Sequence, residues 1–89
     1  MRFQSHNNKG YSLLGEREYE KALHHFQIAY KLRDNPELPK SEWSKNVCNI
    51  ASALSGLNRL DEARILFKKE LERDPRNVDF FLSITFIQN

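Results

Sequence analysis

The sequence predicts an all-α fold built from antiparallel helical hairpins, and two observations carry that prediction. Apolar residues recur at intervals of three and four, the spacing that places side chains on one face of a helix. The chain also repeats itself after 41 residues without a gap. The identical pairs of this repeat are Asn8 with Asn49, Leu13 with Leu54, Gly15 with Gly56, Ala22 with Ala63, and Phe26 with Phe67. We therefore expect one helical unit used twice.

The first hairpin is expected to contain helices over 2–15 and 18–33, with a turn after Gly15 between them. Its second helix carries a single apolar stripe at helical spacing. The stripe consists of Tyr19, Ala22, Leu23, Phe26, Ala29 and Tyr30. Pro36 and Pro39 end this hairpin, because proline lacks the amide hydrogen that a helix interior needs.

The second hairpin is expected to contain helices over 41–56 and 60–73, separated by a break at Gly56. Ser41 is the expected N-cap of its first helix, since a serine hydroxyl can accept a bond from a free amide of the first turn. Glu42 follows in that turn, where a negative charge is favourable. The second unit thus has the same helix–turn–helix order as the first.

A fifth helix is predicted over 78–88, after Pro75 and with Asn77 as its cap. Since 89 residues support one hydrophobic core at most, we expect a single domain. That domain, 1–89, divides into a first repeat over about 3–35, a second over about 41–76 and a terminal helix over about 78–88.

The periodicity also predicts the core. Its expected centre is Ala22, Phe26, Ala63 and Phe67, surrounded by Leu13, Ile50, Leu54 and Leu71. Small residues let helices approach closely, and the phenylalanines fill the space beyond them. Charges alternate in sign over 68–73, which indicates a solvated helix face.

The apolar and small residues of the second repeat follow the order W-x₂-L-G-x₂-Y, A-x₃-F, P. They are Val47, Ile50, Ala51, Leu54, Ala63, Phe67 and Pro75. In the first repeat Gly10, Leu13, Ala22 and Phe26 match, whereas His6 and Lys9 replace bulky apolar residues. On these residues the chain resembles the tetratricopeptide repeat (TPR) family over essentially its whole length.

This resemblance implies that the hairpins stack as a short right-handed superhelix of two repeats plus a terminal helix. The repeat of 41 residues exceeds the family's usual ~34. In that respect it is similar to the longer units of kinesin light chains and of the peptide-pheromone receptors of Gram-positive bacteria.

The resemblance also implies a function: binding of a protein or peptide in a concave groove lined by the first helix of each hairpin. Transferred to this sequence, the groove residues are Asn7, Asn8, Tyr11, Lys45, Asn49, Ser52, Asp79, Ser83 and Phe86. Asn8 and Asn49 recur at the same place in both repeats. Because a side-chain amide both donates and accepts, this pair matches the backbone of an extended peptide.

Catalytic, metal and cofactor sites are not expected. Gly10 and Gly15 have the glycine spacing of a phosphate loop, but the lysine and hydroxyl that would contact phosphate are missing. His24 and His25 are adjacent, so on a helix they point in different directions and cannot share one metal ion. Cys48 has no histidine or carboxylate close in sequence. The sequence therefore predicts that the chain is not an enzyme.

Composition and charge exclude further classes. With 39% apolar and 29% charged residues the chain has enough apolar material to fold. Its 14 basic and 12 acidic residues are evenly distributed, so a nucleic-acid partner is not expected. No segment has the signature of a signal peptide or a membrane span, and a lone cysteine forms no internal disulfide. We expect a cytoplasmic protein without a membrane partner.

Two other functions remain open from the sequence: a structural self-assembly module, and the sensory fragment of a longer peptide-responsive regulator. The first is suggested by the terminal helix, whose apolar residues occupy more than one side. They are Val78, Phe80, Phe81, Leu82, Ile84, Phe86 and Ile87. An apolar helix at the end of an array leaves an exposed patch, so we expect a homo-oligomer formed through it.

Overall fold

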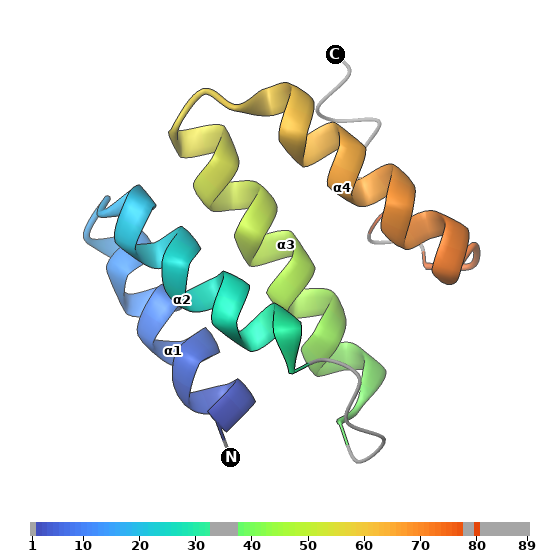
Figure 1. Cartoon of the computed structure of the whole chain (residues 1–89), viewed down its shortest axis with the longest axis horizontal. Helices are drawn as coiled ribbons and strands as arrows, with labels where there is room; N and C mark the ends of the chain where they lie inside the picture. Colours follow the sequence, from blue (N-terminus) through green and yellow to red (C-terminus); the bar gives the residue numbers. More distant parts are fainter. Residues whose placement is uncertain (1, 33–37, 78–79, 81–89) are drawn as a thin grey trace.

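The hairpins expected from the sequence are present. The structure, a computed structural model, describes residues 2–32, 38–77 and 80. Among these residues every regular element is a helix and none is a strand, which confirms the all-α prediction. The helices are α1 (Arg2–Gly15), α2 (Tyr19–Lys31), α3 (Lys40–Gly56) and α4 (Leu60–Arg73), shown in Figure 1. Each one begins and ends within two residues of its predicted bounds.

Consecutive helices lie side by side in chain order. α1 packs on α2, α2 on α3 and α3 on α4, while α1 touches α3 only slightly. Neighbouring helices run in opposite directions, so the described chain consists of antiparallel hairpins (Figure 1). α1 therefore depends mainly on α2 for its position.

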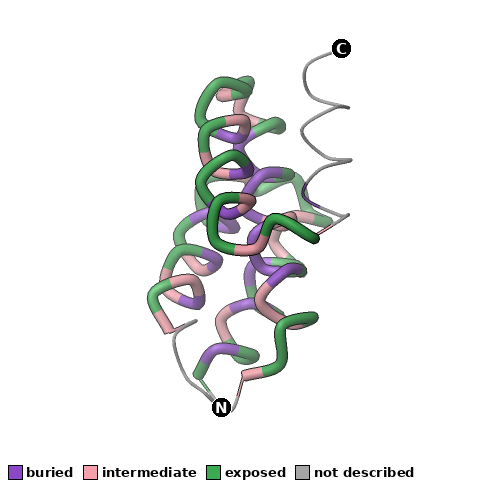
Figure 2. The backbone as a smooth tube through the Cα atoms, turned by 90° about the vertical axis from the view of Figure 1, so that its right-hand side faces the viewer, coloured by how far each residue is buried: buried purple, intermediate pink, exposed green. Residues whose placement is uncertain are grey.

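The predicted core is confirmed at its centre. Ala22, Phe26 and Ala63 are fully buried, and Phe67 is 2% exposed. Ile50 and Leu54 are buried beside them, whereas Leu13 and Leu71 are partly buried at the edge. Figure 2 shows buried residues gathered where the helices face one another.

Gly10 explains how α1 and α2 come so close. A Cβ atom at this position would lie 2.6 Å from two ring atoms of Phe26 and 3.1 Å from the Ala22 carbonyl oxygen. Phe26 is fully buried, so its ring has little freedom to move aside. Only a residue without a side chain fits here.

Both hairpin turns have the same backbone geometry, 41 residues apart. Arg17 (φ 64°) and Asn58 (φ 61°) adopt the left-handed conformation just after α1 and α3. In the first turn Glu18 N–H donates to the Leu13 carbonyl (2.9 Å) and Arg17 N–H to the Leu14 carbonyl (3.0 Å). In the second turn Arg59 N–H donates to the Leu54 carbonyl (2.8 Å) and Asn58 N–H to the Ser55 carbonyl (3.0 Å). This bonding is the Schellman motif that closes many helices. The first turn follows Gly15, the last residue of α1, as expected; the left-handed position within it is Arg17 and not the glycine.

Replacing Arg17 by glycine should stabilise the protein by up to ~1 kcal/mol. A left-handed backbone is unfavourable for a residue with a Cβ atom, and asparagine tolerates it better than arginine does. Asn58→Gly, the equivalent change in the second turn, should therefore stabilise less. Urea denaturation of both variants checks the order, and a loss of stability in Arg17→Gly would contradict the assigned turn geometry.

The start of α3 differs from the expectation. The helix begins at Lys40 with Pro39 in the N-cap position, and no side chain caps it. Ser41 is thus inside the first turn and not the cap. Proline favours this arrangement, because its φ of −63° is preset and its lack of an N–H matters little at a helix start.

Glu70 is the main correction to the predicted surface. Alternating charge placed it on a solvated face, yet it is fully buried. The Tyr30 hydroxyl of α2 donates a hydrogen bond to Glu70 Oε1 of α4. The second carboxyl oxygen, Oε2, has no hydrogen-bond partner within the described part of the chain. The contact joins the two hairpins, and its partners are 40 residues apart.

The segment after α4 is anchored through Asn77 and Phe80. The Phe80 N–H donates to Asn77 Oδ1 at 3.2 Å, which agrees with the predicted cap. Asn77 Nδ2 donates to Ser44 Oγ of α3 at 2.9 Å. The Phe80 ring is buried between Trp43 and Phe67. The rest of the expected terminal helix lies outside the described residues, so self-association through it stays a prediction.

Candidate functional site

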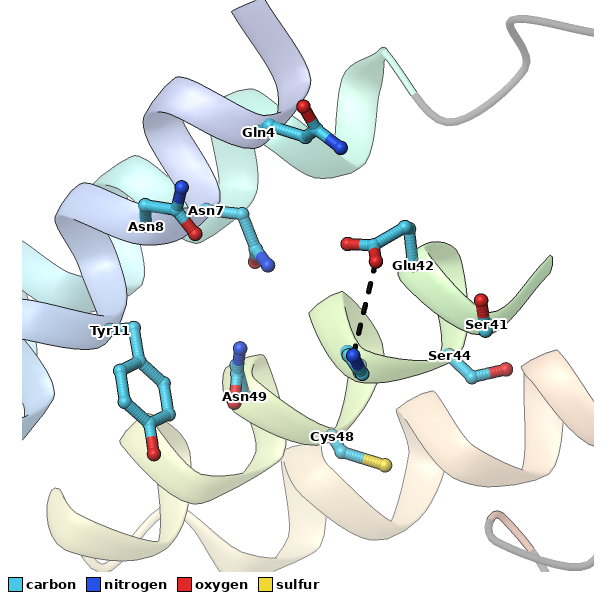
Figure 3. Close-up of a pocket in the computed structure, with 10 residues that line it drawn as sticks. Gln4, Asn7, Asn8, Tyr11, Ser41, Glu42, Ser44, Cys48 and Asn49 are labelled. Atoms are coloured by element: carbon cyan, nitrogen blue, oxygen red, sulfur yellow. Dashed lines mark ion pairs between the residues drawn. The ribbon is translucent and has the colours of Figure 1, made fainter. Parts of the chain in front are cut away.

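A hollow of about 720 Å³ lies between α1 and α3. Figure 3 shows polar side chains from both helices around it. α1 contributes Gln4, Asn7, Asn8 and Tyr11, and α3 contributes Ser41, Glu42, Ser44, Lys45, Cys48 and Asn49. The lining is dominated by carboxamides and hydroxyls, which both donate and accept hydrogen bonds.

Five of the predicted groove residues line this hollow: Asn7, Asn8, Tyr11, Lys45 and Asn49. The packing of α1 beside α3 therefore brings these five residues to one place. Ser52 does not belong to the lining, and its hydroxyl donates to the Cys48 carbonyl at 3.0 Å. Asp79, Ser83 and Phe86 lie outside the described residues.

Asn7 is held in one orientation by a buried neighbour that sequence reasoning missed. Asn46, fully buried on α3, donates from Nδ2 to the Phe26 carbonyl and to Asn7 Oδ1, both at 3.1 Å. The Phe26 carbonyl can only accept, so Asn46 must present its NH₂ group there. The same NH₂ group requires an oxygen from Asn7.

This chain of bonds leaves the Asn7 NH₂ group as a donor at the hollow. Asn7 is 6% exposed, and Figure 3 shows its side chain pointing from α1 into the space before α3. Asn8 and Asn49 contribute further amides at the same hollow. Among the described residues Asn46 Oδ1 has no hydrogen-bond partner although it is buried, so the arrangement is retained at an energetic cost.

The charges of the hollow offset each other. Lys45 Nζ lies 3.9 Å from Glu42 Oε1, one turn earlier on α3. The Lys45 side chain is 69% exposed, so this ion pair contributes little to stability. The other lining residues are uncharged. The hollow therefore favours a neutral polar ligand over an anion or a cation.

Sequence reasoning also missed the lining residues near the start of α1 and of α3. Gln4 lies four residues before Asn8, Ser41 four before Lys45, and Ser44 four before Cys48. Residues at this spacing share one helix face, so the available signal was the helical period itself. The hollow extends one turn farther toward the beginning of each helix than was expected.

Within the described ranges, no group of three or more histidine, cysteine, aspartate or glutamate residues is arranged to hold a metal ion. Nor does any helix of that part of the chain have the length and apolar character needed to span a bilayer. No family model, curated protein or solved structure matches the chain. The function must therefore be inferred from the geometry of the site.

Proposed function

We propose that the chain is a non-catalytic, cytoplasmic binding module similar to TPR repeats, and that the hollow between α1 and α3 holds an extended segment of a peptide or protein. The observation that supports this proposal most strongly is the position of the Asn7 carboxamide. This group is more than nine-tenths buried, is fixed by Asn46, and faces the hollow with an available donor.

A peptide backbone matches this donor. Extended backbone presents carbonyl acceptors and N–H donors at regular intervals, and its groups need partners once water is displaced. Asn7 offers a fixed donor, while the amides of Asn8 and Asn49 can either donate or accept a hydrogen bond. A preset donor also avoids the entropy loss of ordering a side chain upon binding.

The repeated turns support the comparison with helical repeats. The left-handed residues Arg17 and Asn58 and their bonding patterns recur after 41 residues, as the sequence identities do. Arrays of such units present the first helices of successive hairpins on one surface. In this chain those helices are α1 and α3, and the hollow lies between them.

Selection from a displayed library of random peptides tests the function. We expect the immobilised chain to enrich peptides whose binding depends on the hollow. Asn8→Ala combined with Asn49→Ala should weaken that binding roughly 5- to 150-fold, since each lost amide contact removes ~0.5–1.5 kcal/mol. The melting temperature should stay the same, because neither residue belongs to the core.

Gln27→Ala is the matched control for these substitutions. Gln27 is an exposed carboxamide on α2 and does not line the hollow. Enriched peptides should bind this variant as they bind the unmodified chain. Equal affinity of an enriched peptide for the double variant and for the control would show that the recurring asparagines do not take part in binding.

A further inference from the structure

His6 of α1 and His25 of α2 meet through their Nδ1 atoms, which are 3.2 Å apart. Their ring centroids are 5.5 Å apart and their planes differ by 23°. The separation of the ring centres exceeds the separation of the nitrogens by about twice the distance from a ring centre to its own nitrogen. The two nitrogens therefore meet head-on, with the ring planes nearly parallel. In this geometry each nitrogen faces the other directly. Their lone pairs do not converge on a third point, as they would for a chelated metal ion.

A head-on contact of two imidazole nitrogens requires a proton between them. With both rings neutral, one Nδ1–H donates and the other Nδ1 accepts. With one ring protonated, the cation donates to the neutral ring, and the bond becomes charge-assisted. With both rings protonated, two N–H groups face each other and no acceptor remains. The hydrogen bond therefore tolerates one added proton and not two.

The surroundings add to the penalty for the second proton. Lys9 of α1 and Glu20, Lys21 and His24 of α2 line a smaller hollow of about 460 Å³ together with His25, and Arg2 lies one turn before His6. α1 contains no carboxylate, and α2 contains Glu20 alone. Partial burial, followed by the charges of His24, His6 and Lys9, lowers the pKa of His25 below its ordinary 6.5.

We propose that the His6–His25 pair is a proton-sensitive contact that fastens α1 to α2 and releases α1 when both rings carry a proton. α1 touches α3 only slightly, so its position depends on α2. One wall of the larger hollow, including Asn7, Asn8 and Tyr11, belongs to α1. Loosening α1 therefore weakens peptide binding at acid pH. This last consequence rests on the proposed function, whereas the contact itself does not.

The direction of the pH effect follows from proton counting. Below about pH 6.5 the unfolded chain protonates both rings, while the folded chain resists the second proton. The unfolded state then binds more protons, so stability falls as the pH falls. When the folded state binds one proton fewer than the unfolded state, the folding constant drops by at most about tenfold per pH unit. Glu62 contributes in a separate range, since its Arg59 partner lowers the pKa of its carboxyl below 4.5.

Thermal unfolding at about pH 7.5 and about pH 5.5 tests the contact without any ligand. The unmodified chain should lose roughly 4–8 °C in melting temperature between the two conditions. His6→Gln and His25→Gln should lose clearly less, because glutamine adds no second charge. His24→Gln is the comparison variant: it leaves the His6–His25 hydrogen bond in place but removes a charge that also lowers the pKa of His25, so its loss should lie between that of the unmodified chain and those of the pair variants. Equal losses in all four proteins would overturn the proposal.

A histidine titration followed by NMR gives a second readout that does not depend on how stable the variants are. In the unmodified chain the pKa of His25 should lie below its ordinary value, because of partial burial and the like charges of its neighbours. His6→Gln should raise the pKa of His25, because it removes the competing positive charge of the second ring. An unchanged pKa of His25 in that variant would show that the two rings are not coupled. Failure of peptide selection, by contrast, would leave this result unaffected.

Discussion

Replacing Phe67 by alanine is expected to destabilise the protein by ~3–5 kcal/mol, a large part of the ~5–15 kcal/mol that a small domain has. Phe67 is 2% exposed and lies between the core of the second hairpin and Phe80, whose ring centroid is 5.9 Å away. Removing the ring leaves a cavity that α3 and α4 cannot close. Urea denaturation gives the free energy of unfolding.

Ile65→Ala on the same helix is the control for this prediction. Ile65 is 65% exposed, so its truncation removes little buried apolar area. Its free energy of unfolding should lie within ~0.5 kcal/mol of the unmodified chain. If Phe67→Ala unfolded at the same urea concentration as Ile65→Ala, the burial assigned to α4 would be wrong.

Tyr30→Phe is expected to destabilise the protein by ~1–3 kcal/mol, because it leaves a buried carboxyl without its donor. The change removes the hydroxyl that donates to Glu70 Oε1, and Oε2 already lacks a partner. A fully buried carboxyl would then lose the hydrogen bond that joins it to α2. Tyr11→Phe, at a tyrosine that is 65% exposed, provides the matched control.

Combining Tyr30→Phe with Glu70→Leu separates this penalty from ordinary packing. Replacing both polar partners of this bond by apolar groups of similar size can be nearly neutral, because the Glu70 carboxyl is then no longer buried without its donor. The double variant should therefore recover most of the stability that Tyr30→Phe loses. Additive losses in the double variant would show that the Tyr30–Glu70 contact does not connect the hairpins in the way described.

Local patterns were sufficient for the four described helices. The apolar period of three and four, interrupted at Gly15 and Gly56 and by Pro36 and Pro39, determines where helices begin and end within two residues. The burial of Phe26 and Phe67 follows from the same period. Such signals lie within one helix, which is why sequence alone contains them.

Contacts between distant residues could not be predicted in this way. The sign alternation around Glu70 indicates solvent, and nothing local shows that the Tyr30 hydroxyl meets it from another helix. His6 and His25 are 19 residues apart and come together only through the antiparallel packing of α1 and α2. Each of these pairs depends on the rotation of one helix relative to the next.

The site was predictable in outline for the same reason. Asn8 and Asn49 were singled out because they recur, and both line the hollow. The most constrained amide is nevertheless Asn7, since Asn46 and the Phe26 carbonyl fix its orientation. Neither asparagine of that buried contact recurs in the other repeat, so the repeat gave no signal for it.

Chemical-shift mapping of the isotope-labelled chain with a library-selected peptide is the most direct test of the binding groove. We expect the shifts to change along the facing sides of α1 and α3, and most of all at the side-chain amides of Asn7 and Asn49. The outer face of α4, around Ile65 and Lys68, should remain unchanged. Changes confined to α4, or the absence of any peptide enriched above an empty support, would contradict peptide binding between α1 and α3.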